Sequence, residues 1–170
     1  MANEERSYKK IESQHLLKLK EIALTDQNNF FKHYPDYIIF KDKLYAVLLV
    51  QGASKHYVDG ITGIKDFDIL VLYKENTSNN KCICYRRMKS YDCGMPNFGR
   101  YPKDRKKYSN RRVDIRMGEI GSDVTRGNDL KTSLKNYFKE GKTKSIKKWR
   151  KKAVIGIYPK EILGEIIFSS

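Results

Sequence analysis

The apolar residues of this chain fall into short, dense runs that are typical of buried β-strands. Leu44–Val50 and residues 67–73 are the clearest, because both are rich in aliphatic and β-branched residues and are bounded by turn-forming residues. Residues 83–88 and 111–117 are further strand candidates, and residues 153–158 form a strand-like run near the C-terminus. These runs predict a β-sheet at the centre of the fold.

Two segments have apolar residues at helical spacing. The first is residues 8–25, and the second runs from a cap at Asn128 or Asp129 to Gly141. The stripes consist of Leu16, Leu19 and Ala23 in the first segment and of Leu130, Leu134, Tyr137 and Phe138 in the second. The expected fold class is therefore α/β (α+β): a small mixed β-sheet flanked by helices.

The 170 residues suffice for one domain with a real core, and we expect residues 1–170 to form it. We place its core at about 44–117, an N-terminal helix at about 8–25, and C-terminal helices with a basic segment at about 128–170. The basic segment includes "KTKSIKKWRKK" (142–152), in which seven of the eleven residues are Lys or Arg. No internal repeat is visible.

The composition is strongly basic, with a net charge of +15 and a pI of about 9.7. This exceeds the net charge of roughly 2–8 that solubility requires of a small domain, so it favours a polyanionic partner, nucleic acid above all. No apolar run approaches the ~20 residues that a membrane helix needs, and the first ten residues lack the apolar core of a secretory signal. We expect a cytoplasmic protein with no membrane partner.

Three cysteines, Cys82, Cys84 and Cys93, are an odd number without an export signal, which suits a reducing compartment. Three zinc ligands are an alternative interpretation, but the spacing of these cysteines is poor and no histidine is near them in the sequence. Free thiols are the favoured interpretation.

An acidic pair, Asp66 and Asp68, stands at the start of the apolar run 67–73. Side chains alternate in a strand, so the two carboxylates point the same way while Phe67 points into the core. Two like charges on one face raise each other's pKa, and the arrangement needs a compensating cation. Mg²⁺ is the natural one, because it is a hard, oxygen-seeking ion that is commonly shared with substrate phosphates. Asp114 in "RVDIR" offers a third carboxylate in the same kind of setting.

Upstream of the acidic pair lies a candidate phosphate cradle. Gly52, Ala53 and Ser54 follow the run Leu44–Val50 and open a short helical stretch at 54–58. Backbone N–H groups at a helix start favour anions, and glycine allows a phosphate to approach the backbone. The hydroxyl of Ser54 adds a further polar group.

The stretch resembles the signature of the nucleotidyltransferase superfamily, which includes DNA polymerase beta and the CCA-adding enzymes. That signature is an apolar strand, a Gly-Gly or Gly-Ser turn, a spacer of about a dozen residues, an Asp-x-Asp pair and a later third acid. Here the turn is Gly52-Ala53, twelve residues intervene, the pair is Asp66 and Asp68, and Asp114 matches the third acid. Ala53 departs from the usual Gly or Ser. The resemblance covers roughly residues 44–117.

The resemblance implies a magnesium-dependent nucleotidyltransferase that moves a nucleoside monophosphate from an NTP to an acceptor and releases pyrophosphate. Asp66 and Asp68 would hold the metal, Asp114 would help to activate the acceptor hydroxyl, and residues 52–54 would hold the triphosphate. The charge favours RNA or DNA as acceptor.

A basic, aromatic-rich segment between Tyr85 and Arg116 holds eleven Lys or Arg against three acids. It provides either a surface that grips phosphates and stacks bases or a solvated charged loop. Two alternatives to the transferase remain: a non-catalytic nucleic-acid-binding module on the same fold, and a metal-dependent nuclease. The common nuclease signature has a lysine close to its second acid, and "VDIRMGEI" has none.

Overall fold

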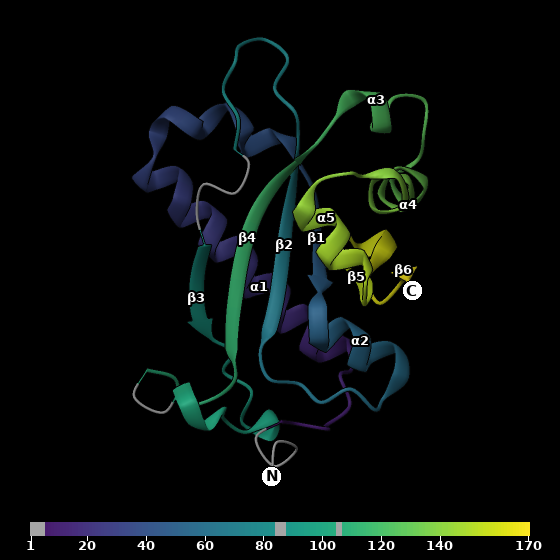
Figure 1. The fold of residues 1–170 in the computed structure, drawn as a ribbon. Helices are drawn as coiled ribbons and strands as arrows, with labels where there is room; N and C mark the ends of the chain where they lie inside the picture. Colours follow the sequence, from purple (N-terminus) through teal and green to yellow (C-terminus); the bar gives the residue numbers. More distant parts are fainter. Residues whose placement is uncertain (1–5, 84–87, 105–106) are drawn as a thin grey trace.

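The computed structural model of this protein describes residues 6–83, 88–104 and 107–170, apart from the side chain of Met88. Its centre is a six-stranded mixed sheet in the order β3-β4-β2-β1-β5-β6 (Figure 1). The strands are β1 (Leu44–Val50), β2 (Phe67–Lys74), β3 (Met88–Asp92), β4 (Arg112–Ile120), β5 (Ala153–Tyr158) and β6 (Ile166–Ser169). Strands β2 and β4 pair in parallel, and the other neighbours are antiparallel. The predicted fold class, a mixed sheet flanked by helices, is confirmed.

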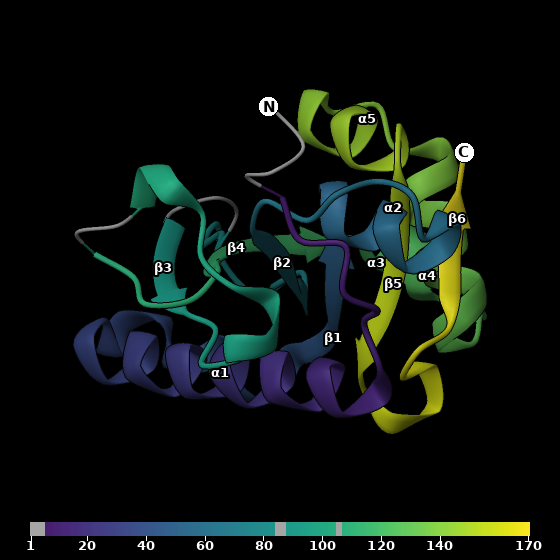
Figure 2. The same ribbon diagram turned by 90° about the horizontal axis from the view of Figure 1, so that it is seen from below.

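The helices lie on both faces of this sheet. They are α1 (Ser13–His33), α2 (Gln51–Asp59), α3 (Ser122–Thr125), α4 (Leu130–Glu140) and α5 (Lys144–Arg150), with short 3₁₀ helices η1 (Pro35–Lys43), η2 (Pro96–Phe98), η3 (Pro102–Asp104) and η4 (Lys160–Ile162). Helix α1 runs under one face of the sheet, while α4 and α5 lie on the other (Figure 2). No helix in the described part of the chain is long and apolar enough to cross a membrane.

Alternation along the strands builds two cores, one on each face. In β2, Phe67 and Ile69 pack with Leu16 and Leu19 of α1, whereas the side chains of Leu70 and Leu72 join a second cluster with α4 and α5. The second cluster contains Trp149, which is almost fully buried. Strand β2 is therefore buried on both faces for most of its length, and it leaves polar side chains on the α5 face only at its ends, at Asp68 and Lys74.

The N-terminal helix differs from the predicted span of 8–25, because it begins at Ser13 and continues to His33. Glu12 caps it, and its backbone N–H donates to Nδ1 of His15 at 2.9 Å. Phe30 and Phe31 extend its buried face by two turns. The helix ends at His33, two residues before Pro35. A residue that precedes proline disfavours helical backbone angles, which explains why Tyr34 does not continue the helix.

Two further expectations need correction. The third strand is Met88–Asp92 and not 83–88; Ile83 is buried outside any strand, and residues 84–87 lie outside the described part of the chain. The segment at about 128–170 holds the expected helices, α4 and α5, and the strand-like run predicted at 153–158 is β5, but the strand that follows it, β6, was not expected. Strand β5 pairs with β1, so the C-terminal region completes the sheet.

Candidate functional site

Asp68 and Asp114 are direct neighbours in the sheet. Strands β2 and β4 pair in parallel with Asp68 opposite Asp114 and Phe67 opposite Val113, so the two aspartates share one face. Asp66 precedes β2 by one residue; burial raises its pKa, and the charge of Asp114 adds to the rise. The structure thus pairs Asp68 with Asp114 on the sheet face opposite to α1, and it places Asp66 near enough for its charge to act on Asp68.

The carboxyl group of Asp68 carries a strongly perturbed acidity. Burial raises its pKa to about 7, and the charges of Asp66 and Asp114 add to the rise, while Arg116 and Lys148 partly oppose it. No hydrogen bond from another described residue reaches Asp68. A carboxylate in this setting is short of positive partners, and it therefore favours either a proton or a cation.

The guanidinium of Arg112 lies among the other acids. Its Nη2 is 3.2 Å from Oδ2 of Asp66, its Nη1 is 3.4 Å from Oδ1 of Asp104, and its Nε is 3.1 Å from Oδ2 of Asp114. Ser90, which faces Asp114 across the β3–β4 pair, donates its hydroxyl to Oδ1 of Asp114 at 2.6 Å. Burial alone would lower the pKa of Arg112, but the three carboxylates outweigh it and the pKa is raised.

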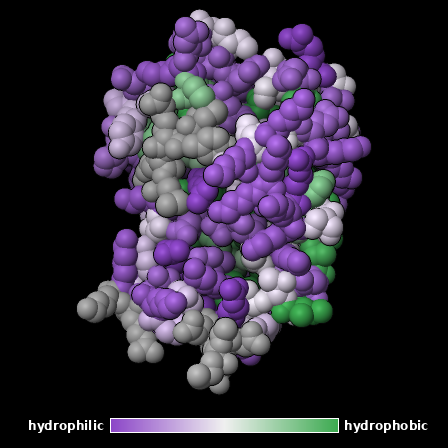
Figure 3. Space-filling view, in the orientation of Figure 1, coloured by the Kyte–Doolittle hydropathy of each residue, from purple (hydrophilic) through white to green (hydrophobic). Residues whose placement is uncertain are grey.

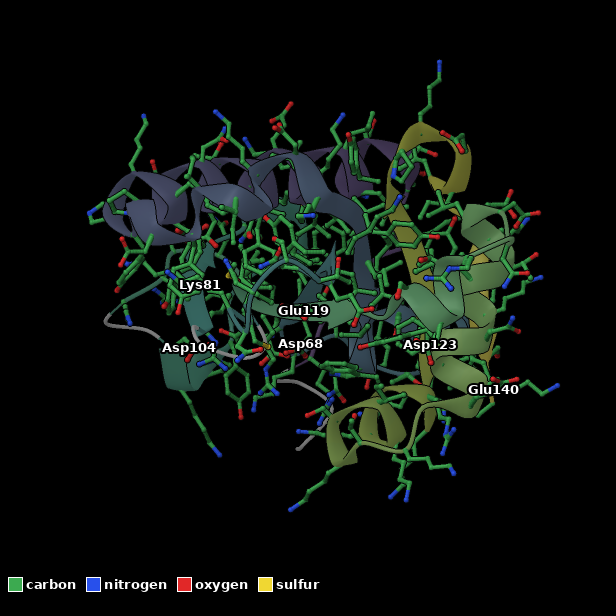
Figure 4. All side chains as sticks on the ribbon, turned by 90° about the horizontal axis from the view of Figure 1, so that it is seen from above. Asp68, Lys81, Asp104, Glu119, Asp123 and Glu140 are labelled. Carbon is green, nitrogen blue, oxygen red and sulfur yellow. The ribbon has the colours of Figure 1, made fainter. Side chains whose placement is uncertain are left out.

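Asp104 is a fourth acid at this site, and sequence reasoning missed it. It ends η3, within the long connection from β3 to β4, and its Oδ2 is buried without a hydrogen-bond partner among the described residues. In Figure 4, Asp68 and Asp104 both lie on the side of the sheet away from α1. Nothing in the local sequence marks Asp104, since a loop has no periodicity. Arg112, in contrast, has the same strand parity as Asp114, and this signal places it on the acidic face.

The carboxylate oxygens of these acids are the kind of ligand that a divalent cation prefers, but the side chains that the structure describes are not arranged as a metal site. Within the described residues no three His, Cys, Asp or Glu side chains form a group that could hold a metal ion. The carboxylates nevertheless exceed the cations paired with them, because Asp68 and Oδ2 of Asp104 have no partner among the described residues. Oxygen acceptors in excess of their counter-ions fit a hard ion such as Mg²⁺. Arg112 is the cation that now pairs with the rest.

The expected phosphate cradle is a turn from β1 directly into α2. Gln51, the first residue of α2, has a left-handed φ of 68°. A Cβ added to Gly52 would meet nothing within 4 Å, so open space surrounds this position. Ala53 and Ser54, however, are 1% and 0% exposed.

The hydroxyl of Ser54 is used by the fold. Its Oγ lies 2.6 Å from the carbonyl oxygen of Ala153 in β5 and 2.7 Å from that of Gln51. The side chain therefore ties α2 to β5, and the expectation that it contacts a phosphate is not supported by this geometry. Gly52 is partly buried but has open space where a side chain would project, so it is the part of the turn that an anion can approach.

Basic side chains border the acidic face, but the expected stacking aromatics mostly do not. Arg116 and Lys148 lie close enough to influence the pKa of Asp68. Phe98 and Tyr108 are buried, and the ring of Phe98 packs edge-on against Phe67 at 5.2 Å. The face of the molecule seen in Figure 1 is predominantly hydrophilic (Figure 3). The site therefore has basic side chains that can contact phosphates, but few aromatic rings that can stack on bases. Tyr85 lies outside the described residues.

Among the described residues, no metal site includes a cysteine. Cys93 is a buried free thiol. Cys84 lies outside the described part of the chain, so the predicted state of the third thiol stays a prediction.

No protein-family model, curated protein or solved structure matches this chain.

Proposed function

We propose that this protein is a magnesium-dependent nucleotidyltransferase, which moves a nucleoside monophosphate from an NTP to an acceptor hydroxyl and releases pyrophosphate. The observation that carries the proposal is the register of β2 and β4, which sets Asp68 beside Asp114 on one face of the sheet. The β1–α2 turn at Gly52 follows Val50, the residue paired with Asp68 on the other side. The turn that would bind the anion therefore follows β1, and the acidic pair lies on β2 and β4, the next two strands of the sheet.

The roles follow from the position of each residue. Asp66 and Asp68 would hold the magnesium, and Asp114 would accept the proton of the attacking hydroxyl or share the metal. Magnesium, when bound there, would neutralise charge on the phosphates and stabilise the transferring group. The backbone at Gly52 would bind the terminal phosphates, since glycine lets an anion approach N–H groups closely. Ser90 would keep the carboxylate of Asp114 oriented through its hydrogen bond.

Nucleic acid is the acceptor class that the charge distribution supports. The net charge is +15, and Arg116 and Lys148 lie beside the acids. Helix α5, which contains Lys148, carries two further exposed lysines, Lys144 and Lys147, while its Arg150 donates to the carbonyl oxygens of Phe138 and Lys139. A phosphodiester backbone would pair with these groups while its terminal hydroxyl reached Asp114.

A second candidate, a non-catalytic nucleic-acid-binding module on this fold, is favoured by one observation. Arg112 already pairs with Asp66 and Asp114, which is the compensation expected at an acidic site that has no metal. Such a module would use the basic surface alone.

The two functions separate in one experiment. Wild type and the double variant Asp66→Asn/Asp68→Asn are incubated with Mg²⁺, each labelled NTP in turn, and pooled RNA, DNA and protein acceptors. A transferase incorporates label with wild type and loses it in the double variant, because the metal ligands are gone. If wild type incorporates no label from any NTP into any pool, yet binds RNA or DNA as tightly as the double variant, the binding module replaces the transferase.

A further inference from the structure

Arg112 is the most heavily shared side chain of the candidate site. Its guanidinium contacts Asp66, Asp104 and Asp114, which come from three separate segments of the chain. Two of these acids are the ones to which the proposed function assigns a divalent cation. Only part of the Arg112 side chain reaches solvent, at 29% exposure, so it is held in place within the cluster.

Arg112 and a divalent cation cannot pair fully with the same carboxylate oxygens. The guanidinium uses Oδ2 of Asp66 and Oδ2 of Asp114, and Ser90 uses the other oxygen of Asp114. A metal ion that draws Asp66, Asp68 and Asp114 together would stand within a few ångströms of the guanidinium, and the two positive charges would repel each other. The guanidinium must therefore give up at least two of its contacts when the cation arrives.

Asp104 is placed to retain the guanidinium after that exchange. It already contacts Nη1 of Arg112, and it comes from η3, outside the acidic strand ends. Its Oδ2 is buried and has no hydrogen-bond partner among the described residues, so a second contact to Arg112 is open there. Arginine suits such an exchange because its planar fork can bind a carboxylate through two parallel hydrogen bonds.

We propose that Arg112 is an internal counter-ion that competes with Mg²⁺ for Asp66 and Asp114, and that Asp104 holds its guanidinium when the metal is bound. The inference rests on the metal site of the proposed function and adds the residue pair that sets its affinity. In the absence of metal, Arg112 keeps like-charged carboxylates together; with metal, it is drawn toward Asp104.

The test is a calorimetric titration of the full chain with MgCl₂, without nucleotide. It compares wild type, Arg112→Gln and, as a matched control, Arg126→Gln, which removes the same charge from the exposed end of α3. If the paired arrangement holds about nine-tenths of the molecules, Arg112→Gln binds Mg²⁺ about tenfold more tightly than wild type. Arg126→Gln should bind like wild type. Equal, weaker or absent binding by Arg112→Gln overturns the competition.

A second variant guards against misfolding. Arg112→Lys keeps the charge but loses the planar fork, so its affinity for Mg²⁺ should fall between those of wild type and Arg112→Gln. Thermal melts in chelator and in Mg²⁺ accompany both: Arg112→Gln should melt below wild type in chelator and recover with Mg²⁺. If Arg112→Gln stays unfolded in both conditions, the lysine variant provides the test. In that case, an affinity of Arg112→Lys for Mg²⁺ that is no higher than that of wild type would overturn the proposal.

The part assigned to Asp104 is tested in a double-mutant cycle. Asp104→Asn should weaken Mg²⁺ binding when Arg112 is present and leave it unchanged in the Arg112→Gln background, because there is no guanidinium to hold. Weakening in both backgrounds would make Asp104 a direct metal ligand and overturn this part. Nucleotide transfer by wild type is assayed separately, so a protein that binds Mg²⁺ competitively but transfers nothing refutes the proposed function alone.

Discussion

Asp68 of β2 and Asp114 of β4 lie opposite each other in a parallel strand pair, with their carboxylates on the same face. Asp114 receives a hydroxyl from Ser90 and a guanidinium from Arg112, whereas Asp68 receives neither. The imbalance explains why the pKa of Asp68 rises to about 7, first through burial and then through its acidic neighbours. The pKa of Asp68 therefore lies close to neutral pH.

The first prediction concerns stability in chelator. Because the pKa of Asp68 is higher in the folded than in the unfolded chain, folding favours its protonated form. The resulting stability is complete below about pH 4 and is lost as the pH rises toward 7. Asp68→Asn mimics the protonated form, so it should stabilise the protein at pH 8 by about 2–4 kcal/mol and change little at pH 4. Urea unfolding at both values measures this, with the exposed Asp42→Asn as control; an equal effect at both pH values would contradict it.

The second prediction concerns the β1–α2 turn. Gly52→Ala should fold like wild type, since an added Cβ meets nothing within 4 Å. Gly52→Asp should also fold, but it places a negative charge where the phosphates of an NTP would bind. We expect it to lose NTP binding in an equilibrium titration while Gly52→Ala keeps most of it. Equal NTP affinity in the two variants would remove the turn from the site. Ala53 is a poorer probe, because a charge at this buried position would disturb the fold itself.

Ser54→Ala separates a structural role from a binding role. The variant leaves the carbonyl of Ala153 without the hydroxyl that reaches it at 2.6 Å. Losing a buried hydrogen bond of this kind should cost about 1–3 kcal/mol of unfolding free energy. The affinity for NTP should not change, provided that the comparison is made well below the melting temperature. A stable variant with weakened NTP binding would restore Ser54 to the phosphate site.

The basic face of α5 should govern nucleic-acid affinity. Lys147→Gln/Lys148→Gln removes two exposed charges beside the acidic cluster. If both contact phosphates, the log–log slope of affinity against salt should become shallower by about 1.4 for single strands, at ~0.7 per contact. The control Lys32→Gln/Lys41→Gln removes two exposed charges near α1 and should leave the slope unchanged. The same loss of slope in both variants would point to a diffuse electrostatic effect and against a surface on α5.

The central strands could be predicted from the sequence because a strand that is buried on both faces consists of a continuous run of apolar residues. Leu44–Val50 has the predicted bounds, and β2 and β4 differ from the predicted spans by only a few residues at their ends. Strand β3 was misplaced because an edge strand with the sequence "MKSYD" has little apolar pattern. The length of α1 was underestimated because Asp26 and Gln27 are polar yet buried, which interrupts the stripe that would have extended it.

Only those residues of the candidate site that lie on or next to strands could be predicted, because the alternation of side chains along a strand determines which face they share. Asp66, Asp68 and Asp114 follow from parity along two strands, together with the assumption that these strands are neighbours. The position of Asp104 depends on how a long connection folds back over the sheet, and no local rule determines that path. The engagement of Ser54 depends on β5, a strand 99 residues further along the chain. Long-range contacts of this kind are not encoded in a short sequence window.

The parallel pairing of β2 with β4 also bears on how the protein reaches its folded state. Strands β1 and β2 are joined through α2, and β3 and β4 form their own antiparallel pair, so each half can form from contacts close in sequence. The acids lie on the seam between these halves, with Asp68 on one side and Asp114 on the other. Contacts between segments so far apart in sequence form late, because the chain must first close a long loop. Joining the halves brings like charges together, so a cation that bridges the seam would speed this step of refolding and slow its reversal during unfolding.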